Sequence, residues 1–134
     1  MNTTDKLLLC VEDDHDDSLW IGEISAEVDP KIVFVAKPNG RDALLFLDHQ
    51  KEQNHLPCLI LLDLNMPLMD GKETLLAIKK DPELREIPVV VFTTSSSKKD
   101  ELFCEKHGAE MITKPQSFPG FKRTIKHLVL SRCI

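Results

Sequence analysis

The chain has 134 residues, of which 42% are hydrophobic and 29% charged, as in one soluble globular domain with a buried core. Its formal net charge of −5 argues against nucleic acid as a partner, because an acidic surface repels phosphate. The apolar stretches are too short for a signal peptide or a membrane span, so we expect a cytoplasmic protein without membrane contact, folded as a single domain over 1–134.

The cysteines predict a reducing compartment. The chain has four of them, with no CxxC motif and no spacing typical of a metal site. Cys10 and Cys58 lie in apolar runs, where a free buried thiol is the expected state.

Short apolar runs alternate with segments of helical period five times along the chain. The runs predict strands at 6–11, 31–36, 58–62, 89–92 and 109–113. The segments between and after them predict helices at 18–28, 41–49, 72–80, about 97–107 and 116–132. Such an alternation predicts an α/β fold, with a parallel sheet and helices on both of its faces.

Local signals support the helix positions. Asn39 or Gly40 can cap the second helix, whose buried side we expect to hold Leu44, Leu45 and Leu47. Ser97 begins a capping arrangement for the fourth helix, and Gly108 suits the position just after its end. Asp16 and Asp17 fall at the start of the first helix, where the helix dipole favours negative charge, and we assign them no other role.

Four of the five strands end on groups that can do chemistry. The first ends on Glu12 and Asp13, the third on Asp63, the fourth on Thr93 and the fifth on Lys114. Polar residues often follow strands, and that alone would explain each one singly. In a parallel sheet, however, these ends share one edge, and ligands of open α/β sheets bind just beyond it. We therefore expect one site at this edge.

Acidic groups held together at this edge predict a divalent cation. Their mutual repulsion would raise carboxyl pKa values unless a cation intervened. Magnesium takes oxygen ligands and is commonly held by one or two carboxylates plus a phosphate. We expect Asp13 and Asp63 to be direct ligands and Glu12 to be a ligand or a water-mediated partner. The backbone carbonyl of Asn65 would supply a further oxygen.

Two readings of Lys114 remain open from the residues alone. It could neutralise the acids as a salt bridge, or it could hold a bound phosphoryl group. Thr93 is suited to donate a hydroxyl hydrogen bond to the same group, and an aspartate such as Asp63 can form an acyl phosphate. A metal and a lysine would then stabilise the charge on the transferring oxygens.

The chain resembles the receiver domain of two-component response regulators over nearly its whole length. The matching motifs are VEDD at 11–14, LLDLNMPLMDG at 61–71, PVVVFTTS at 88–95 and ITKP at 112–115. The resemblance implies a flavodoxin-like (βα)5 fold with strand order 2-1-3-4-5. It also implies the following roles: Asp63 as phosphoacceptor, Glu12 and Asp13 as acid pair, Thr93 as switch hydroxyl, Lys114 as phosphate-contacting lysine.

This family implies a signalling switch and not an enzyme with an outside substrate. A histidine kinase or a phosphotransfer protein would donate the phosphoryl group, and the altered face around the fourth strand would bind a downstream protein or a second copy of the chain. The DLNMP…DG form and the TTSSS run look most like small stand-alone regulators partnered with bacterial phytochromes. By the same resemblance, Asn65 and Ser95 occupy positions that tune how fast the acyl phosphate hydrolyses.

One position departs from the family pattern. The aromatic switch residue, three before the lysine, is Met111 here, and the chain contains no tyrosine. A switch in which Thr93 moves together with an aromatic ring is therefore in question, although methionine is flexible enough to repack.

Two other classes fit less well. A phosphatase of the haloacid dehalogenase type also uses an aspartate at a strand end, but it needs an acid two positions later, where this chain has Asn65, and the chain has no room for a cap domain. A flavodoxin needs a phosphate-binding loop after the first strand. The five carboxylates within 12–17 would instead repel a phosphate.

Overall fold

The computed structural model describes residues 5–66 and 68–134, so Pro67 of the motif at 61–71 and the first four residues lie outside the described part. The strands are β1 (Leu7–Val11), β2 (Val33–Lys37), β3 (Leu59–Leu62), β4 (Val89–Thr93) and β5 (Glu110–Thr113). The helices are α1 (His15–Val28), α2 (Gly40–Glu52), α3 (Gly71–Lys80), α4 (Lys98–Lys106) and α5 (Phe118–Cys133).

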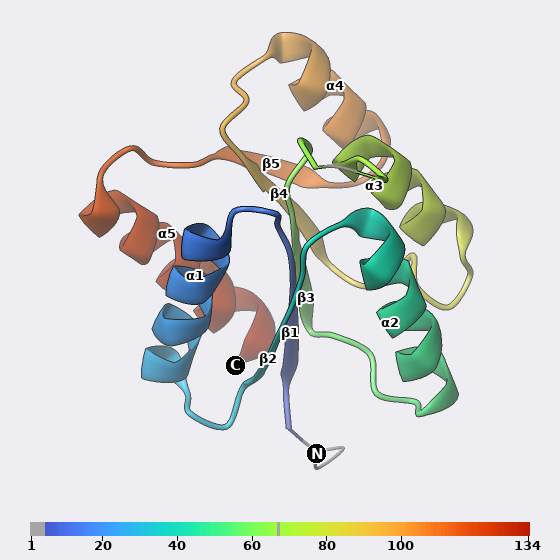
Figure 1. Ribbon diagram of the computed structural model, residues 1–134, viewed down its shortest axis with the longest axis horizontal. Helices are drawn as coiled ribbons and strands as arrows, with labels where there is room; N and C mark the ends of the chain where they lie inside the picture. The colour runs from blue at the N-terminus through green and yellow to red at the C-terminus, as the bar shows by residue number, and fades with distance from the viewer. Residues whose placement is uncertain (1–4, 67) are drawn as a thin grey trace.

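The strands form one parallel sheet in the order β2-β1-β3-β4-β5, which confirms the expected flavodoxin-like architecture. Helices α1 and α5 cover one face and α2 and α3 cover the other, with α4 above them beside β5 (Figure 1). The three central strands are buried on both faces, which explains their unbroken apolar runs. Successive side chains of each strand alternate between the two cores, as Leu8 and Leu9 do in β1.

Side-chain caps begin the helices where the sequence places polar residues. Asn39, Asp70 and Ser97 each accept a hydrogen bond from the backbone three residues later, at the start of α2, α3 and α4. Asp14 does the same for α1, so this helix begins at His15, earlier than expected. Gly108 follows α4 with a φ of 72°, as expected for a residue just past a helix end.

Two expectations about α2 are wrong. The helix continues to Glu52 and does not end at 49, because its last turn stays hydrogen-bonded through His49 and Lys51. Leu45 is 62% exposed and points away from the core, whereas Leu47 is fully buried. Residues 45 and 47 lie about 200° apart around an α-helix, so both cannot face the sheet.

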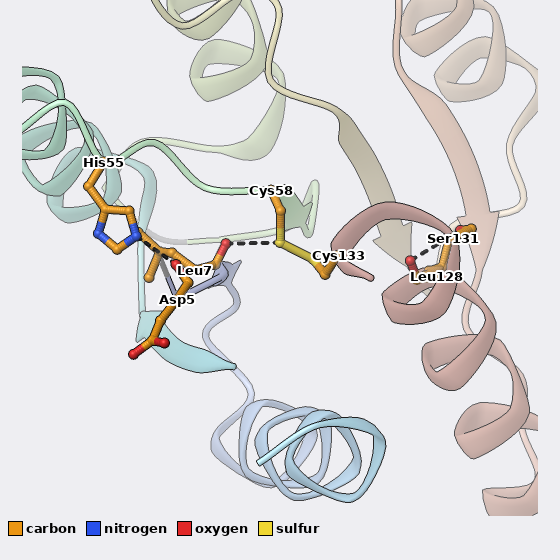
Figure 2. The surroundings of a disulfide bond; sticks show 7 residues. All are labelled: Asp5, Leu7, His55, Cys58, Leu128, Ser131 and Cys133. Carbon is orange, nitrogen blue, oxygen red and sulfur yellow. Dashed lines mark hydrogen bonds between the residues drawn. A yellow bond between two sulfur atoms is a disulfide. The ribbon is translucent and has the colours of Figure 1, made fainter. Parts of the chain in front are cut away.

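The expectation of a free thiol is correct for Cys10 and wrong for Cys58, so the cysteines do not support the reducing compartment expected from them. Cys58 forms a disulfide with Cys133, which joins the residue before β3 to the last turn of α5 (Figure 2). The backbone N–H of Cys58 donates to the Leu7 carbonyl at 2.8 Å. Beside it, the His55 ring contacts the Asp5 carbonyl at 2.9 Å. These bonds fasten the amino ends of the central strands to α5.

The loop between β3 and α3 returns closely to the strand it leaves. The Gly71 N–H donates to the Leu64 carbonyl at 2.9 Å, and a Cβ at position 71 would lie 2.1 Å from the Asp63 carbonyl oxygen. Only glycine therefore fits at this point without displacing the backbone of Asp63. Among the described residues, no helix is long and apolar enough to cross a membrane.

Candidate functional site

Sheet register brings the acidic residues together at the upper end of β1 in Figure 1. Val11 pairs with Leu62, so the residues that follow them, Glu12 and Asp63, leave adjacent strands side by side. The Asp63 N–H donates to the Val11 carbonyl at 3.0 Å, which extends the sheet pairing up to the site. One carboxylate oxygen each from Glu12, Asp13 and Asp63 lies within 4.8 Å of the others.

Lys114 reaches the same group from the far side of β4. Its backbone N–H donates to the Thr93 carbonyl at 2.7 Å, which places it next to the end of β4. Its Nζ lies 2.5 Å from Oε1 of Glu12 and 3.8 Å from Oδ2 of Asp63. The ammonium also donates to Oδ2 of Asp17, at 2.7 Å. The lysine side chain is 7% exposed, so its charge is buried and depends on these carboxylates.

Burial and charge both shift the pKa values in this group. Burial raises the pKa of the Glu12 carboxyl, and the charge of Asp63 adds to the rise, while Lys114 opposes it. Burial lowers the pKa of Lys114, but the hydrogen bonds to Asp17 and Glu12 outweigh it and raise the pKa above its usual range. The lysine therefore stays charged.

These acids fit a hard divalent cation. The three carboxylates come from two neighbouring strand ends, and Asp13 is exposed, so one side of the group faces solvent and leaves room for water ligands. Both Glu12 oxygens already have partners, because Oε1 binds Lys114 and Oε2 accepts from the Asp14 N–H at 3.2 Å. This arrangement favours Asp13 and Asp63 as direct ligands and a water-mediated role for Glu12.

The expected hydroxyl is buried at the end of β4, the strand that pairs with β3. Thr93 has no exposed surface, and its Oγ1 accepts a hydrogen bond from the Ser95 N–H at 3.3 Å. The Ser95 hydroxyl in turn donates to Asp100 of α4 at 2.7 Å. Asp100 also pairs with Lys72 of α3 at 2.7 Å. A continuous set of polar contacts thus leads from Thr93 to two helices.

Asn65 and Met111 lie where the sequence places them. The Asn65 N–H donates to Oδ1 of Asp63 at 3.4 Å, and its side chain is exposed. A hollow of about 480 Å³ opens beside Asn65, and it is lined by Asp13, Leu64, Asn65, Met66, Asp70, Lys72 and Asp100. Met111 is half-buried and packs against the core on the α2–α3 side of the sheet.

The contacts of two residues in this region are not predicted from the sequence. Asp17 was assigned only to the helix dipole, yet it binds Lys114 directly. A signal existed, because Asp17 is four residues before the buried Ile21 and therefore lies on the packed face of α1. The second residue is Asp100, and nothing in the sequence indicates its pairing with Lys72.

Comparison with known proteins identifies the family. A model of the response regulator receiver domain matches residues 8–126. The chain belongs to this family. It is 41% identical over 126 residues to the response regulator Rcp1 of Synechocystis, covering 90% of this chain and 84% of that protein.

Solved structures of receiver domains have the same fold. The phosphorylated cyanobacterial phytochrome response regulator RcpA superimposes with a TM-score of 0.89 at 32% identity, covering 96% of this chain and 94% of that one. The Mn²⁺-bound form of Rcp1 gives a TM-score of 0.78 at 32% identity, covering 92% and 91%. The expected family and fold are thus correct, and structural relatives include phytochrome response regulators.

Proposed function

We propose that this receiver domain is a phosphorylation-dependent switch whose phosphoacceptor is Asp63. The observation that carries the proposal is the gathering of Lys114 and two further acids around Asp63, from strand ends that are far apart in the chain. Thr93 ends β4, the strand paired with β3. The Asp63 side chain is nearly buried at the end of β3, and the next two residues, Leu64 and Asn65, line an open hollow together with Asp13. A phosphate-bearing donor can therefore approach it from solvent.

In the proposed reaction, an Asp63 oxygen forms a bond to phosphorus as the phosphorus–nitrogen bond of a phosphohistidine breaks. Asp13 and Asp63 would hold a magnesium ion, with Glu12 and the Asn65 backbone carbonyl completing the ligand set. When bound, this ion supplies positive charge that offsets the charge on the transferring oxygens. Lys114, now 3.8 Å from Asp63, would donate to the new phosphoryl group after exchanging one of its carboxylate contacts, and Thr93 would donate from the β4 side.

The signal would leave through the surface formed by β4, α4 and β5. A hydrogen bond from Thr93 to the phosphoryl group would weaken its present contact with Ser95, which is bonded to Asp100 of α4. The position of α4 would shift with it. Met111 of β5 would repack in place of the family's aromatic residue. We propose a downstream protein or a second copy of the chain as the partner on this surface.

The phosphodonor we propose is a histidine kinase or a phosphotransfer protein. RcpA, among the structures similar to this chain, is a phytochrome response regulator. A kinase of the phytochrome type is therefore the first candidate. We place the reaction in the cytoplasm, where the ATP for such a kinase is available.

The test is phosphorylation of the chain by acetyl phosphate with Mg²⁺, followed by intact-protein mass spectrometry. We expect one added phosphoryl group on the unaltered protein and none on Asp63→Asn. Asp16→Asn, which changes an exposed aspartate of α1, serves as the matched control and should be phosphorylated normally. Equal labelling of Asp63→Asn would contradict the proposal. Sustained hydrolysis of a phosphomonoester substrate would favour the phosphatase class instead.

A further inference from the structure

The Lys114 ammonium makes its short contacts with carboxylates other than that of the proposed phosphoacceptor. It has three N–H groups. Two of them make short contacts with carboxylates, to Glu12 at 2.5 Å and to Asp17 at 2.7 Å. The distance to Asp63 is 3.8 Å, too long for a hydrogen bond. Lys114 must therefore change its contacts before it can donate fully to a phosphoryl group on Asp63.

Asp17 is held firmly in its place. It belongs to the first turn of α1, on the same side of the helix as the buried Ile21 and Ile24. Its backbone N–H donates to the capping side chain of Asp14 at 3.1 Å, which fixes the start of the helix. Its side chain is 18% exposed, so the contact with Lys114 is weakly screened by solvent.

Among the described residues, Lys114 is the only cation within salt-bridge distance of Asp17. Glu12 has a second role, because it belongs to the acidic group that fits a cation. Asp17 lies outside that group and adds one negative charge that the lysine must offset. A phosphoryl group on Asp63 would compete with this charge for the same ammonium.

We propose that Asp17 is a positioning residue that restrains Lys114 and so weakens its interaction with a phosphoryl group on Asp63. This inference rests on the proposed role of Asp63. Loss of the Asp17 charge leaves Lys114 with a greater net attraction for the phosphoryl oxygens. Asparagine at position 17 keeps the size and an acceptor oxygen, so it removes the charge and leaves the shape.

The test is a titration with beryllofluoride, an analogue of the phosphoryl group, at saturating Mg²⁺. Trp20 is the only tryptophan of the chain, and it lines a hollow of about 300 Å³ together with Asp17 and Lys114. Its fluorescence therefore reports binding, and the midpoint of the titration is compared between variants. Asp17→Asn should bind beryllofluoride about fivefold more tightly than the unaltered protein.

Two further variants separate this effect from a change in the fold. Asp16→Asn removes the same charge one residue away, from an exposed side chain, and should stay within about twofold of the unaltered midpoint. Asp17→Glu keeps the charge and should restore the unaltered affinity. Thermal unfolding, measured in parallel, detects a purely structural role, which would move Tm in Asp17→Asn and leave the midpoint unchanged.

Equal or weaker binding by Asp17→Asn than by Asp16→Asn would overturn the inference. If the proposed function were wrong, the result would be different: the unaltered protein itself would show no Mg²⁺-dependent binding of beryllofluoride. Asp63→Asn should show no binding in either case.

Discussion

The two ends of the sheet are built in opposite ways. At the carboxyl ends of the strands, charged side chains are buried against one another and share a single lysine. At the amino ends, the disulfide between Cys58 and Cys133 and backbone hydrogen bonds hold β1, β3 and α5 together. In the proposed switch the first end would exchange its contacts when a phosphoryl group adds charge, whereas the second end is fixed by a covalent bond.

Reducing the disulfide should have the largest effect on stability. The two cysteines are 75 residues apart, so opening the bond restores much freedom to the unfolded chain and should lower the free energy of unfolding by about 4 kcal/mol. Urea unfolding with and without a thiol reductant measures this change. In Cys133→Ser, the reductant should have no effect. Mg²⁺ affinity should not change on reduction, and a loss of affinity would contradict the independence of the two ends.

Removing the shared lysine should destabilise the other end by about 3 kcal/mol, because it leaves buried carboxylates without a counter-ion. The variant is Lys114→Met, and urea unfolding at neutral pH without divalent ions is the measurement. Added Mg²⁺ should recover part of the loss. Lys122→Met provides the control, because Lys122 pairs with Glu27 at a half-exposed position and should change stability little. Equal losses in the two variants would argue against a special role for the buried cluster.

The raised pKa of Glu12 predicts that pH and Mg²⁺ act against each other. A carboxyl whose pKa is raised on folding stabilises the folded protein while protonated, and this contribution is lost as pH rises through the raised pKa. The metal-free protein should therefore lose stability as pH rises from acid to neutral and beyond. Because a nearby cation favours the charged carboxylate, Mg²⁺ affinity should rise about tenfold between about pH 6 and about pH 8.

Calorimetric titration with Mg²⁺ at both pH values measures this rise. Glu12→Gln cannot titrate at this position and should show a much flatter dependence on pH. If Mg²⁺ affinity rose equally with pH in the unaltered protein and in Glu12→Gln, the group that loses its proton would not be Glu12.

The smallest effect should come from the contact between α3 and α4. Lys72 and Asp100 form an ion pair at partly exposed positions, so Lys72→Met should lower Tm by about 2 °C or less. High salt should reduce the difference between the variant and the unaltered protein. Lys98→Met breaks a more exposed pair within α4, with Glu101, and should have still less effect. If Lys98→Met lowered Tm more than Lys72→Met does, the ion pair between α3 and α4 would not contribute to stability as expected.

Most of the fold and the centre of the site could be predicted from the sequence. Apolar runs mark strands buried on both faces, and capping residues such as Asn39 and Ser97 mark where helices begin. The common edge of a parallel sheet then brings Glu12, Asp63 and Lys114 together without further information. Strand order came only from the family resemblance, because the connections alone allow several orders.

Contacts between helices and distant segments could not be predicted. The disulfide depends on how the last turn of α5 meets the start of β3, and neither cysteine has a local signal for its partner. The bond from Asp17 to Lys114 joins α1 to the residue after β5. The expectation that Leu45 is buried was wrong, because three leucines within four helical positions cannot all face one side of the helix. Each of these contacts depends on the direction in which a side chain points in the folded molecule.

The position of the proposed phosphoacceptor, Asp63, depends on Gly71, a residue with no functional group of its own. A methyl group there would lie 2.1 Å from the Asp63 carbonyl oxygen and 2.5 Å from Cα of Leu64, so even alanine would push the strand end out of line. Such a variant would retain every acid, the hydroxyl and the amine, and we still expect it to be phosphorylated poorly in the proposed reaction. A mutational screen limited to reactive side chains would overlook Gly71, although the absence of a side chain there allows Asp63 its position.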